Sequence, residues 1–190
     1  MAAGAGDAAV VADAAVTYLE GYLYDDPAAQ AAFRHAAAIA HAAGRKVALT
    51  LSDSFCVDRH RAAFRALVRE HVDILFANES EITALYQVND LASAVARTRA
   101  EVAVAAITRG ADGSLALRGE ETVEIPAEPT RVVDTTGAGD VYAAGFLTAL
   151  TAGRGLATCA RLGGIAAAEI ISHYGARAER DLRGELAALG

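Results

Sequence analysis

Residues 134–150 read DTTGAGDVYAAGFLTAL, a glycine-rich turn that runs directly into an apolar helix. Gly137 and Gly139 allow the backbone to turn tightly, so that successive N–H groups are exposed where the helix begins. The partial positive charge at a helix N-terminus adds to these donors, and together they form a cradle for an oxyanion or a phosphate. Asp140 lies in the first turn of the helix, where its carboxylate can accept a proton from an attacking hydroxyl. The stretch therefore predicts a site for group transfer to a hydroxyl.

Two other interpretations of the same stretch stay open. Asp134 or Thr135 can act only as a helix cap, with the glycines doing no more than turning the chain. A dinucleotide-binding fingerprint, GxGxxG, fits less well because it requires a glycine at the position of Tyr142. Binding of a nicotinamide cofactor would be needed to support that second interpretation.

Length and composition limit the classes to which the chain can belong. Its 190 residues suffice for one moderately large domain or two very small ones. With 54% hydrophobic and only 22% charged residues, an intrinsically disordered chain is excluded. The formal net charge of −7 gives no general attraction for nucleic acid or anionic lipid. Cys56 and Cys159 lie far apart in the sequence, so neither a disulfide framework nor a zinc site is expected. The tyrosines are assigned to packing in the core and at its boundary. No apolar run reaches the roughly 18 residues of a membrane span and no basic signal-peptide region is present, so a cytoplasmic location is expected.

Apolar strands alternate with helices along the chain. We expect strands at Val16–Tyr24 with its loop, Lys46–Leu51, Asp73–Ala77, Val102–Thr108 and Arg131–Val133, and a β-hairpin over Arg109–Ile125. We expect helices from Asp25–Pro27 to about Ala43, and over about Asp58–Glu70, Glu79–Tyr86, Asp90–Arg99, Ala138–Leu150, Gly155–Ser172 and Arg180–Leu189. Near-continuous apolar strands between helices predict an α/β fold, with a parallel sheet covered on both faces.

Polar or glycine-rich residues follow four of the predicted strands. These loops are Ser52–Ser54, Asn78–Glu81, Thr108–Gly110 and Asp134–Asp140. Ligands of open α/β sheets bind beyond the carboxyl ends of the strands. One such loop can arise by chance, but four favour a binding site at this edge of the sheet.

Asn78 and Glu81 stand three residues apart at a helix start and therefore share one helix face. An amide and a carboxylate in this arrangement suit a hydrated magnesium ion, which keeps several of its waters. A capping box, with Asn78 as the N-cap and Glu81 at the third helical position, explains the pair without any metal. The chain has no P-loop motif, so the charge of a phosphate would have to be met by backbone amides, a metal and Arg109.

These motifs together resemble those of the ribokinase-like (PfkB) carbohydrate and nucleoside kinases, and within them the bacterial adenosine kinase-like branch. DTTGAGDVYAAGFL is similar to the family's C-terminal signature, ANESE at Ala77–Glu81 to its NxxE pattern, and TRGADGS at Thr108–Ser114 to its nucleotide-side turn. LEGYLYD, ALTLSDSFCVDRHR and AAEIISHYGAR are similar to the adenosine kinase-like branch. The resemblance runs from about Val10 to the end of the chain. It implies a three-layer α/β/α ribokinase-like fold with a mostly parallel sheet and a small β-hairpin.

The resemblance also implies roles for the residues that match. Asp140 would be the catalytic base that deprotonates the acceptor hydroxyl, and the amides of Gly137, Ala138 and Gly139 would form the anion hole for the γ-phosphoryl group. The cofactors implied are ATP and Mg²⁺, and in some members a monovalent cation such as K⁺. Asn78 and Glu81 would organise Mg²⁺ and its waters around the phosphates, so that Asn78 also counts among the cofactor-binding residues. Thr108 and Gly110 would contact the ATP phosphates, with Arg109 and Gly113 as further cofactor-binding residues of the same turn. Asp134 and Thr136 match the cation region, and the helix Gly163–His173 would flank the adenine.

Parts of the family pattern cannot be found in this chain. Family members carry the first strands of the sheet, a small β lid, a paired-glycine motif and a sugar-binding aspartate upstream of the part that matches. We therefore expect residues 1–9 to be a disordered or truncated terminus, and residues 10–190 to form a single, partial ATP-binding and catalytic domain.

The expected activity is transfer of the γ-phosphoryl group of ATP to a hydroxymethyl group of a nucleoside or sugar. Likeness to one branch favours adenosine, while ribose, fructose-type sugars and keto-deoxy sugar acids stay open because the discriminating contacts lie in the unmatched part. A chain that binds nucleotide without catalysis is a further alternative. The expected partner is a small-molecule substrate, without nucleic acid or membrane, and a homodimer is compatible with the family because its lids often mediate pairing.

Overall fold

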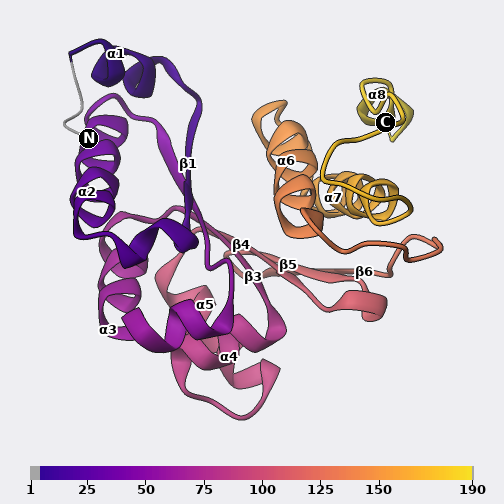
Figure 1. Ribbon diagram of the computed structural model, residues 1–190, viewed down its shortest axis with the longest axis horizontal. Helices are drawn as coiled ribbons and strands as arrows, with labels where there is room; N and C mark the ends of the chain where they lie inside the picture. Colours follow the sequence, from indigo (N-terminus) through magenta and orange to yellow (C-terminus); the bar gives the residue numbers. More distant parts are fainter. Residues whose placement is uncertain (1–4, 190) are drawn as a thin grey trace. The chain divides into compact units, whose positions relative to one another are not determined.

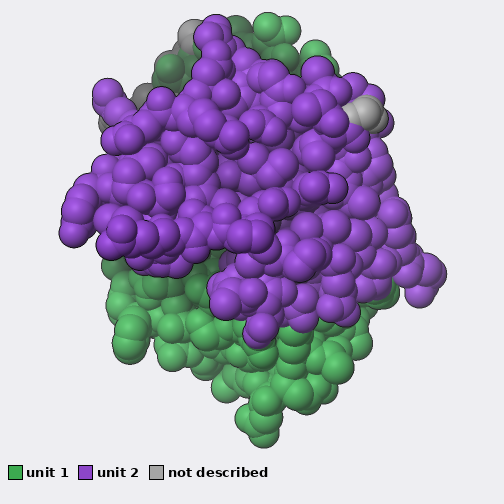
Figure 2. All heavy atoms as spheres, turned by 90° about the vertical axis from the view of Figure 1, so that its right-hand side faces the viewer, with its two compact units in different colours: residues 1–105 green, residues 106–190 purple. Residues whose placement is uncertain are grey.

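The structure, a computed structural model, describes residues 5–189 and divides the chain into two compact units (Figure 2). One unit comprises Met1–Ala105 and the other Ala106–Gly190, with the division inside the strand β4 (Val104–Thr108). Among the described residues, six strands form one sheet in the order β1-β2-β3-β4-β5-β6. The sequence predicts a single domain over residues 10–190, and this remains a prediction about domain organisation.

The first unit is built on parallel strands that the sequence predicts from their apolar runs. They are β1 (Val16–Glu20), β2 (Lys46–Thr50) and β3 (Ile74–Asn78), and the register places Leu19 beside Leu49 and Leu49 beside Leu75. Val47, Ala48 and Leu49 are fully buried, as expected for a strand covered on both faces. The helices of this unit are α1 (Ala5–Asp13), the 3₁₀ helix η1 (Gly21–Asp25), α2 (Pro27–Ala42), α3 (Ser54–His71), α4 (Glu79–Tyr86) and α5 (Leu91–Glu101).

Aspartate caps determine where two of these helices begin. Asp26 accepts a hydrogen bond from the N–H of Ala28 at 2.8 Å, with Pro27 as the first helical residue, as the sequence predicts. Asp53 accepts one from the N–H of Cys56 at 2.8 Å and caps α3. The predicted start of this helix at Asp58 is therefore wrong, because Asp53 acts as the cap rather than as part of a loop.

The second unit contains a β-hairpin and a pair of closely packed helices (Figure 1). The antiparallel strands are β5 (Ser114–Arg118) and β6 (Glu121–Ile125), which confirms the predicted hairpin. The helices are the 3₁₀ helix η2 (Gly110–Asp112), α6 (Ala138–Thr151), α7 (Leu156–Ile170) and the four-residue α8 (Glu185–Ala188). A Cβ atom on Gly145 would lie 2.7 Å from the Leu162 carbonyl oxygen, so this glycine allows α6 and α7 to approach closely.

Three segments differ from the structure expected for them. Arg131–Val133 forms no strand, because the N–H of Val133 donates to the Ile171 carbonyl at 2.8 Å instead of to a neighbouring strand. The helix expected over Arg180–Leu189 is limited to α8, since Asp181 bonds the N–H and guanidinium of Arg183 in a local turn that competes with a helix. Ala5–Asp13 forms a helix, in keeping with its alanine content, where the sequence leads us to expect a disordered or truncated terminus over residues 1–9; residues 1–4 lie outside the described residues.

The α/β fold class with a mostly parallel sheet is confirmed. Parallel pairing joins β1 to β2 and β2 to β3, and antiparallel pairing is found in the β5–β6 hairpin. Over residues 5–189, no helix is both long and apolar enough to cross a lipid bilayer.

Candidate active site

The glycine-rich turn forms the N-terminal end of α6 in the second unit. Gly137 caps the helix with φ +79°, a left-handed conformation that favours glycine, and a Cβ atom there would lie 2.9 Å from the Ala176 Cβ. Gly139 has open space around the position of its missing side chain, with no heavy atom within 4 Å. The N–H of Ala138 lies 3.2 Å from the Thr135 carbonyl oxygen, so this member of the expected anion hole is already engaged within the turn. Asp140 is exposed in the first helical turn, where the sequence places it.

Asp134, at the start of the turn, is held by three donors. One carboxylate oxygen accepts the Thr136 N–H at 2.9 Å and the Thr136 hydroxyl at 2.7 Å, and the other accepts the Gly175 N–H at 3.2 Å. The Thr136 hydroxyl, the Thr136 N–H and the Gly175 N–H lower the pKa of this carboxyl. In this structure the carboxylate shapes the turn, and a monovalent cation bound here would share the Asp134 oxygens with these donors.

Asn78 and Glu81 form the capping box that the sequence offers as the alternative to a metal site. The Asn78 side-chain oxygen accepts the Glu81 N–H at 2.9 Å. In return Glu81 accepts the Asn78 N–H at 2.9 Å and the Asn78 side-chain N–H at 2.7 Å. Glu81 is 5% exposed, and burial raises its pKa although the Asn78 N–H offsets part of the effect.

The same geometry decides what kind of metal contact this pair allows. Both Glu81 oxygens already accept hydrogen bonds, and the side chain is almost fully buried. Within residues 5–189, no group of three or more His, Cys, Asp or Glu side chains is arranged to hold a metal ion. The pair therefore fits a magnesium ion that keeps its waters and is held mainly by phosphates, but not one that Glu81 ligates directly.

Glu81→Ala is expected to lower the free energy of unfolding by about 1 kcal/mol, because it removes the acceptor of the capping box. Glu81→Gln is expected to cost less. The pKa of Glu81 is higher in the folded than in the unfolded state, so its ionisation lowers the stability of the fold as the pH rises through the folded pKa. Glutamine carries no charge, so Glu81→Gln avoids this cost. Urea unfolding followed by circular dichroism at pH 7 measures both, with the exposed first-turn Glu79→Ala as control. Equal losses of unfolding free energy for Glu81→Ala, Glu81→Gln and Glu79→Ala would contradict a stabilising role of Glu81 in the capping box.

The turn expected to contact ATP lies between β4 and β5. Thr108 is the last residue of β4, and Gly110 and Gly113 have φ values of +59° and +82°. The Arg109 guanidinium lies 3.2 Å from a Glu124 carboxylate oxygen and 3.2 Å from the Asp112 carbonyl oxygen, while among the described residues its buried Nε has no hydrogen-bond partner. Arg109 therefore braces the hairpin in this structure, and the glycines shape the turn.

The sequence interpretation missed a set of exposed apolar side chains in the first unit. Tyr22, Leu23 and Phe55 are 60%, 54% and 75% exposed and follow the carboxyl ends of β1 and β2. Two contacts between side chain and backbone link the segments that carry them: the Tyr22 N–H donates to the Ser52 hydroxyl oxygen at 3.2 Å, and the Cys56 thiol donates to the Gly21 carbonyl oxygen at 3.2 Å. The available signal was their position, since Tyr22 and Leu23 lie between Gly21 and the acidic Asp25, and Phe55 directly follows the polar loop Ser52–Ser54.

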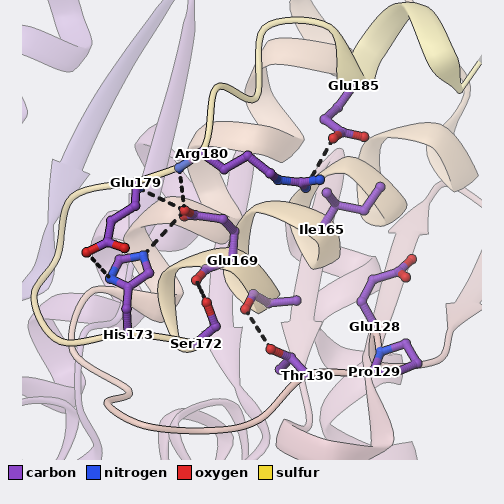
Figure 3. Close-up of a pocket in the computed structure, with 11 residues that line it drawn as sticks. Glu128, Pro129, Thr130, Ile165, Glu169, Ser172, His173, Glu179, Arg180 and Glu185 are labelled. Atoms are coloured by element: carbon purple, nitrogen blue, oxygen red, sulfur yellow. Dashed lines mark hydrogen bonds and ion pairs between the residues drawn. The ribbon is translucent and has the colours of Figure 1, made fainter.

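A pocket of about 720 Å³ lies within the second unit at the end of α7 (Figure 3). It is lined by residues of 128–130, of the C-terminal half of α7 and of 172–185. The helix expected to flank an adenine, Gly163–His173, contributes to this lining, whereas Asp140 and the glycine-rich turn do not. The structure thus places the predicted residues in local groups: Asn78 with Glu81 in the first unit, and the other predicted groups in the second.

The chain is similar to known kinases in both sequence and structure. A model described as the pfkB family of carbohydrate kinases matches residues 3–182. Two solved structures, a probable sugar kinase protein from Rhizobium etli CFN 42 and the adenosine kinase from Sinorhizobium meliloti, are each 47% identical with a TM-score of 0.92, covering 96% of this chain and 57% of theirs. Cytidine kinase from Thermococcus kodakarensis is 40% identical over 119 residues, which are 58% of this chain and 42% of that protein. The chain thus spans about half the length of these relatives.

Proposed function

The chain belongs to the pfkB family of carbohydrate kinases, and we propose that it carries the catalytic and ATP-binding part of a nucleoside kinase, with adenosine as the first candidate acceptor. The observation that carries the proposal is the glycine-rich turn at the start of α6, with open space at Gly139 and an exposed Asp140 in the first helical turn. Backbone donors at a helix N-terminus beside a carboxylate are suited to holding a phosphoryl group while a hydroxyl loses its proton.

In this proposal each group acts mainly by position and charge. Asp140 accepts the proton of the acceptor's hydroxymethyl group, and the amides of Gly137, Ala138 and Gly139 hold the transferring γ-phosphoryl group. The Ala138 N–H would exchange its 3.2 Å contact with Thr135 for the phosphoryl oxygen. A bound Mg²⁺ would neutralise charge on the phosphates, with Asn78 and Glu81 orienting its waters. Gly110 and Gly113 would keep the ATP-side turn open to the nucleotide, beside Thr108 and Arg109, and Asp134 with Thr136 remains the candidate region for K⁺.

The exposed aromatic side chains favour a nucleoside over a free sugar as acceptor. Tyr22 and Phe55 present large apolar surfaces at the carboxyl ends of neighbouring strands, where ligands of such sheets bind. A purine base offers a flat face for stacking on aromatic rings, whereas ribose or fructose offers hydroxyl groups that need polar partners. Substrates of the relatives do not decide the matter, because the two solved structures of equal identity are described as a sugar kinase and an adenosine kinase.

Phe55→Ala is expected to raise the KM for adenosine about tenfold, because loss of stacking on one base costs about 1–3 kcal/mol. The KM for Mg·ATP and the thermal midpoint of unfolding should change little, since Phe55 is 75% exposed. Steady-state kinetics with each substrate varied in turn makes the measurement, and Phe55→Tyr, which keeps the ring, is the matched control. Equal increases in both KM values would show that the ring does not contact the nucleoside.

The proposed function is tested by release of ADP from Mg·ATP by the purified chain. Adenosine, cytidine, ribose and fructose are compared at equal concentrations, and calorimetry measures the binding of Mg·ATP separately. Turnover greatest with adenosine supports the proposal, and turnover greatest with a sugar supports the sugar-kinase alternative that the Rhizobium etli relative suggests. Binding of Mg·ATP without turnover on any acceptor would overturn the kinase proposal in favour of a non-catalytic nucleotide-binding chain.

A further inference from the structure

Glu169 is a buried carboxylate in the last turn of α7. It lies in the stretch AAEIISHYGAR that resembles the adenosine kinase-like branch, but the resemblance assigns this side chain no role of its own. It is 9% exposed, and one of its oxygens accepts the backbone N–H groups of Glu179 and Arg180, each at 2.8 Å (Figure 3). The His173 ring lies 3.3 Å from the same oxygen. The other oxygen is buried and has no hydrogen-bond partner among the described residues. A buried charged group costs stability when one of its oxygens lacks a hydrogen-bond partner. Stability alone therefore does not explain a glutamate at this position.

The contacts of Glu169 end on a segment without regular structure, residues 174–180, all of them exposed. Burial raises the pKa of Glu169, but the two backbone N–H groups and His173 outweigh this effect, and the net pKa is lowered. The Tyr174 carbonyl, followed by Glu179 and Glu169, raises the pKa of His173. Both pKa shifts favour an ionised Glu169 beside a protonated His173. This ion pair holds the start of the segment at the end of α7, and the bonds from Glu179 and Arg180 hold its other end there.

Gly175 and Ala176, near the start of this segment, contact the glycine-rich turn. The Gly175 N–H donates to the Asp134 carboxylate at 3.2 Å, and Gly175 adopts φ +94° to do so. The Ala176 Cβ lies against Gly137, within 2.9 Å of the position that a Cβ atom would take there. One segment therefore connects Glu169 to both the first residue of the turn and the residue that caps α6.

We propose that Glu169 is a positioning residue, whose carboxylate anchors residues 174–180 so that this segment supports the Asp134–Gly137 turn during phosphoryl transfer. The inference rests on the proposed function, since the turn is the part assigned to the phosphoryl group. Glu169 bonds the segment at Glu179 and Arg180 while Gly175 bonds Asp134, so in this proposal Glu169 acts through the segment. Misplacing backbone donors by about 1 Å costs catalysis far more than it costs substrate binding.

The test compares Glu169→Ala with Glu169→Gln, whose amide oxygen can still accept both backbone N–H groups. In Glu169→Ala we expect faster amide hydrogen exchange over residues 174–180, a kcat lowered about tenfold or more, and a KM for adenosine within about twofold of wild type. Glu169→Gln should recover much of the protection and of kcat. Asp181→Asn is the control, because it breaks the exposed ion pair with Arg183 and none of the contacts of Glu169.

The outcomes separate this inference from the proposed function. A wild-type chain without turnover contradicts the proposed function, while the exchange data still decide whether Glu169 anchors the segment. Unchanged exchange over residues 174–180 in Glu169→Ala overturns the anchor. Faster exchange with an unchanged kcat in an active chain overturns the positioning role, as does an equal fall in kcat for Asp181→Asn.

Discussion

Asp140→Asn is expected to lower kcat for the phosphorylation of adenosine by about 10²–10⁴-fold, the range that a positioned general base contributes. Asparagine has almost the same size and keeps the side chain in the first turn of α6, but it cannot take the proton of the acceptor hydroxyl. The KM for Mg·ATP and its binding measured by calorimetry should stay close to wild type, because the nucleotide is assigned to backbone amides and the β4–β5 turn.

The control for this variant is Asp13→Asn, which removes one exposed carboxylate from α1 in the first unit. It changes the net charge by the same amount as Asp140→Asn and should leave kcat unaltered. Turnover of Asp140→Asn within about tenfold of wild type would exclude Asp140 as the base. A loss of Mg·ATP binding in parallel with kcat would instead assign Asp140 to the nucleotide site.

Gly113→Ala is expected to lower the free energy of unfolding by about 3 kcal/mol or more, well above the loss for an ordinary substitution. Gly113 has φ +82° and ψ −131°, and an added Cβ would lie 2.0 Å from the Ile125 carbonyl oxygen and 2.6 Å from the Pro126 carbonyl carbon. These are backbone atoms at the end of β6, so the hairpin must open to admit the methyl group. Urea unfolding monitored by circular dichroism gives the measurement.

Gly119→Ala is the matched control, because it lies in the same hairpin and also has a positive φ, +53°. A Cβ atom there meets nothing within 4 Å, so only the left-handed backbone conformation is penalised, at about 1–2 kcal/mol. Gly113 combines its positive φ with ψ −131°, outside the left-handed helical region, so the difference between the two variants reports the close approach at Gly113 together with its less accessible backbone conformation. Similar losses for both would show that the hairpin relaxes around the added methyl group.

Features that depend on neighbouring residues could be predicted well from the sequence. The bounds of α4 are those expected, Glu79–Tyr86, and the hairpin was predicted from Gly119 and the alternating runs around it. The capping box of Asn78 and Glu81 was foreseen as an alternative to a metal site, and the structure confirms it. The role of the pair toward Mg²⁺ stays a prediction, as do the roles of Asp140 and the glycine-rich turn.

Features that depend on distant segments could not be predicted. The tyrosines were assigned to core and boundary packing, but Tyr22 is exposed and its backbone is tied to Ser52 after another strand. Arg109 was assigned to phosphate charge, yet its guanidinium lies beside Glu124, which depends on how the hairpin closes. Composition and spacing contain no information about which of these pairs will meet.

By itself the sequence determined the α/β class, most element boundaries, the glycine-rich turn and the family, because caps, turns and apolar periods act between residues only a few positions apart. Only the tertiary structure decided that Phe55 is exposed, that Gly113 admits no side chain and that Glu169 anchors a segment beyond its own helix. Those properties arise from contacts between elements far apart in the chain, and such contacts are selected by the packing of the whole core rather than by any local pattern.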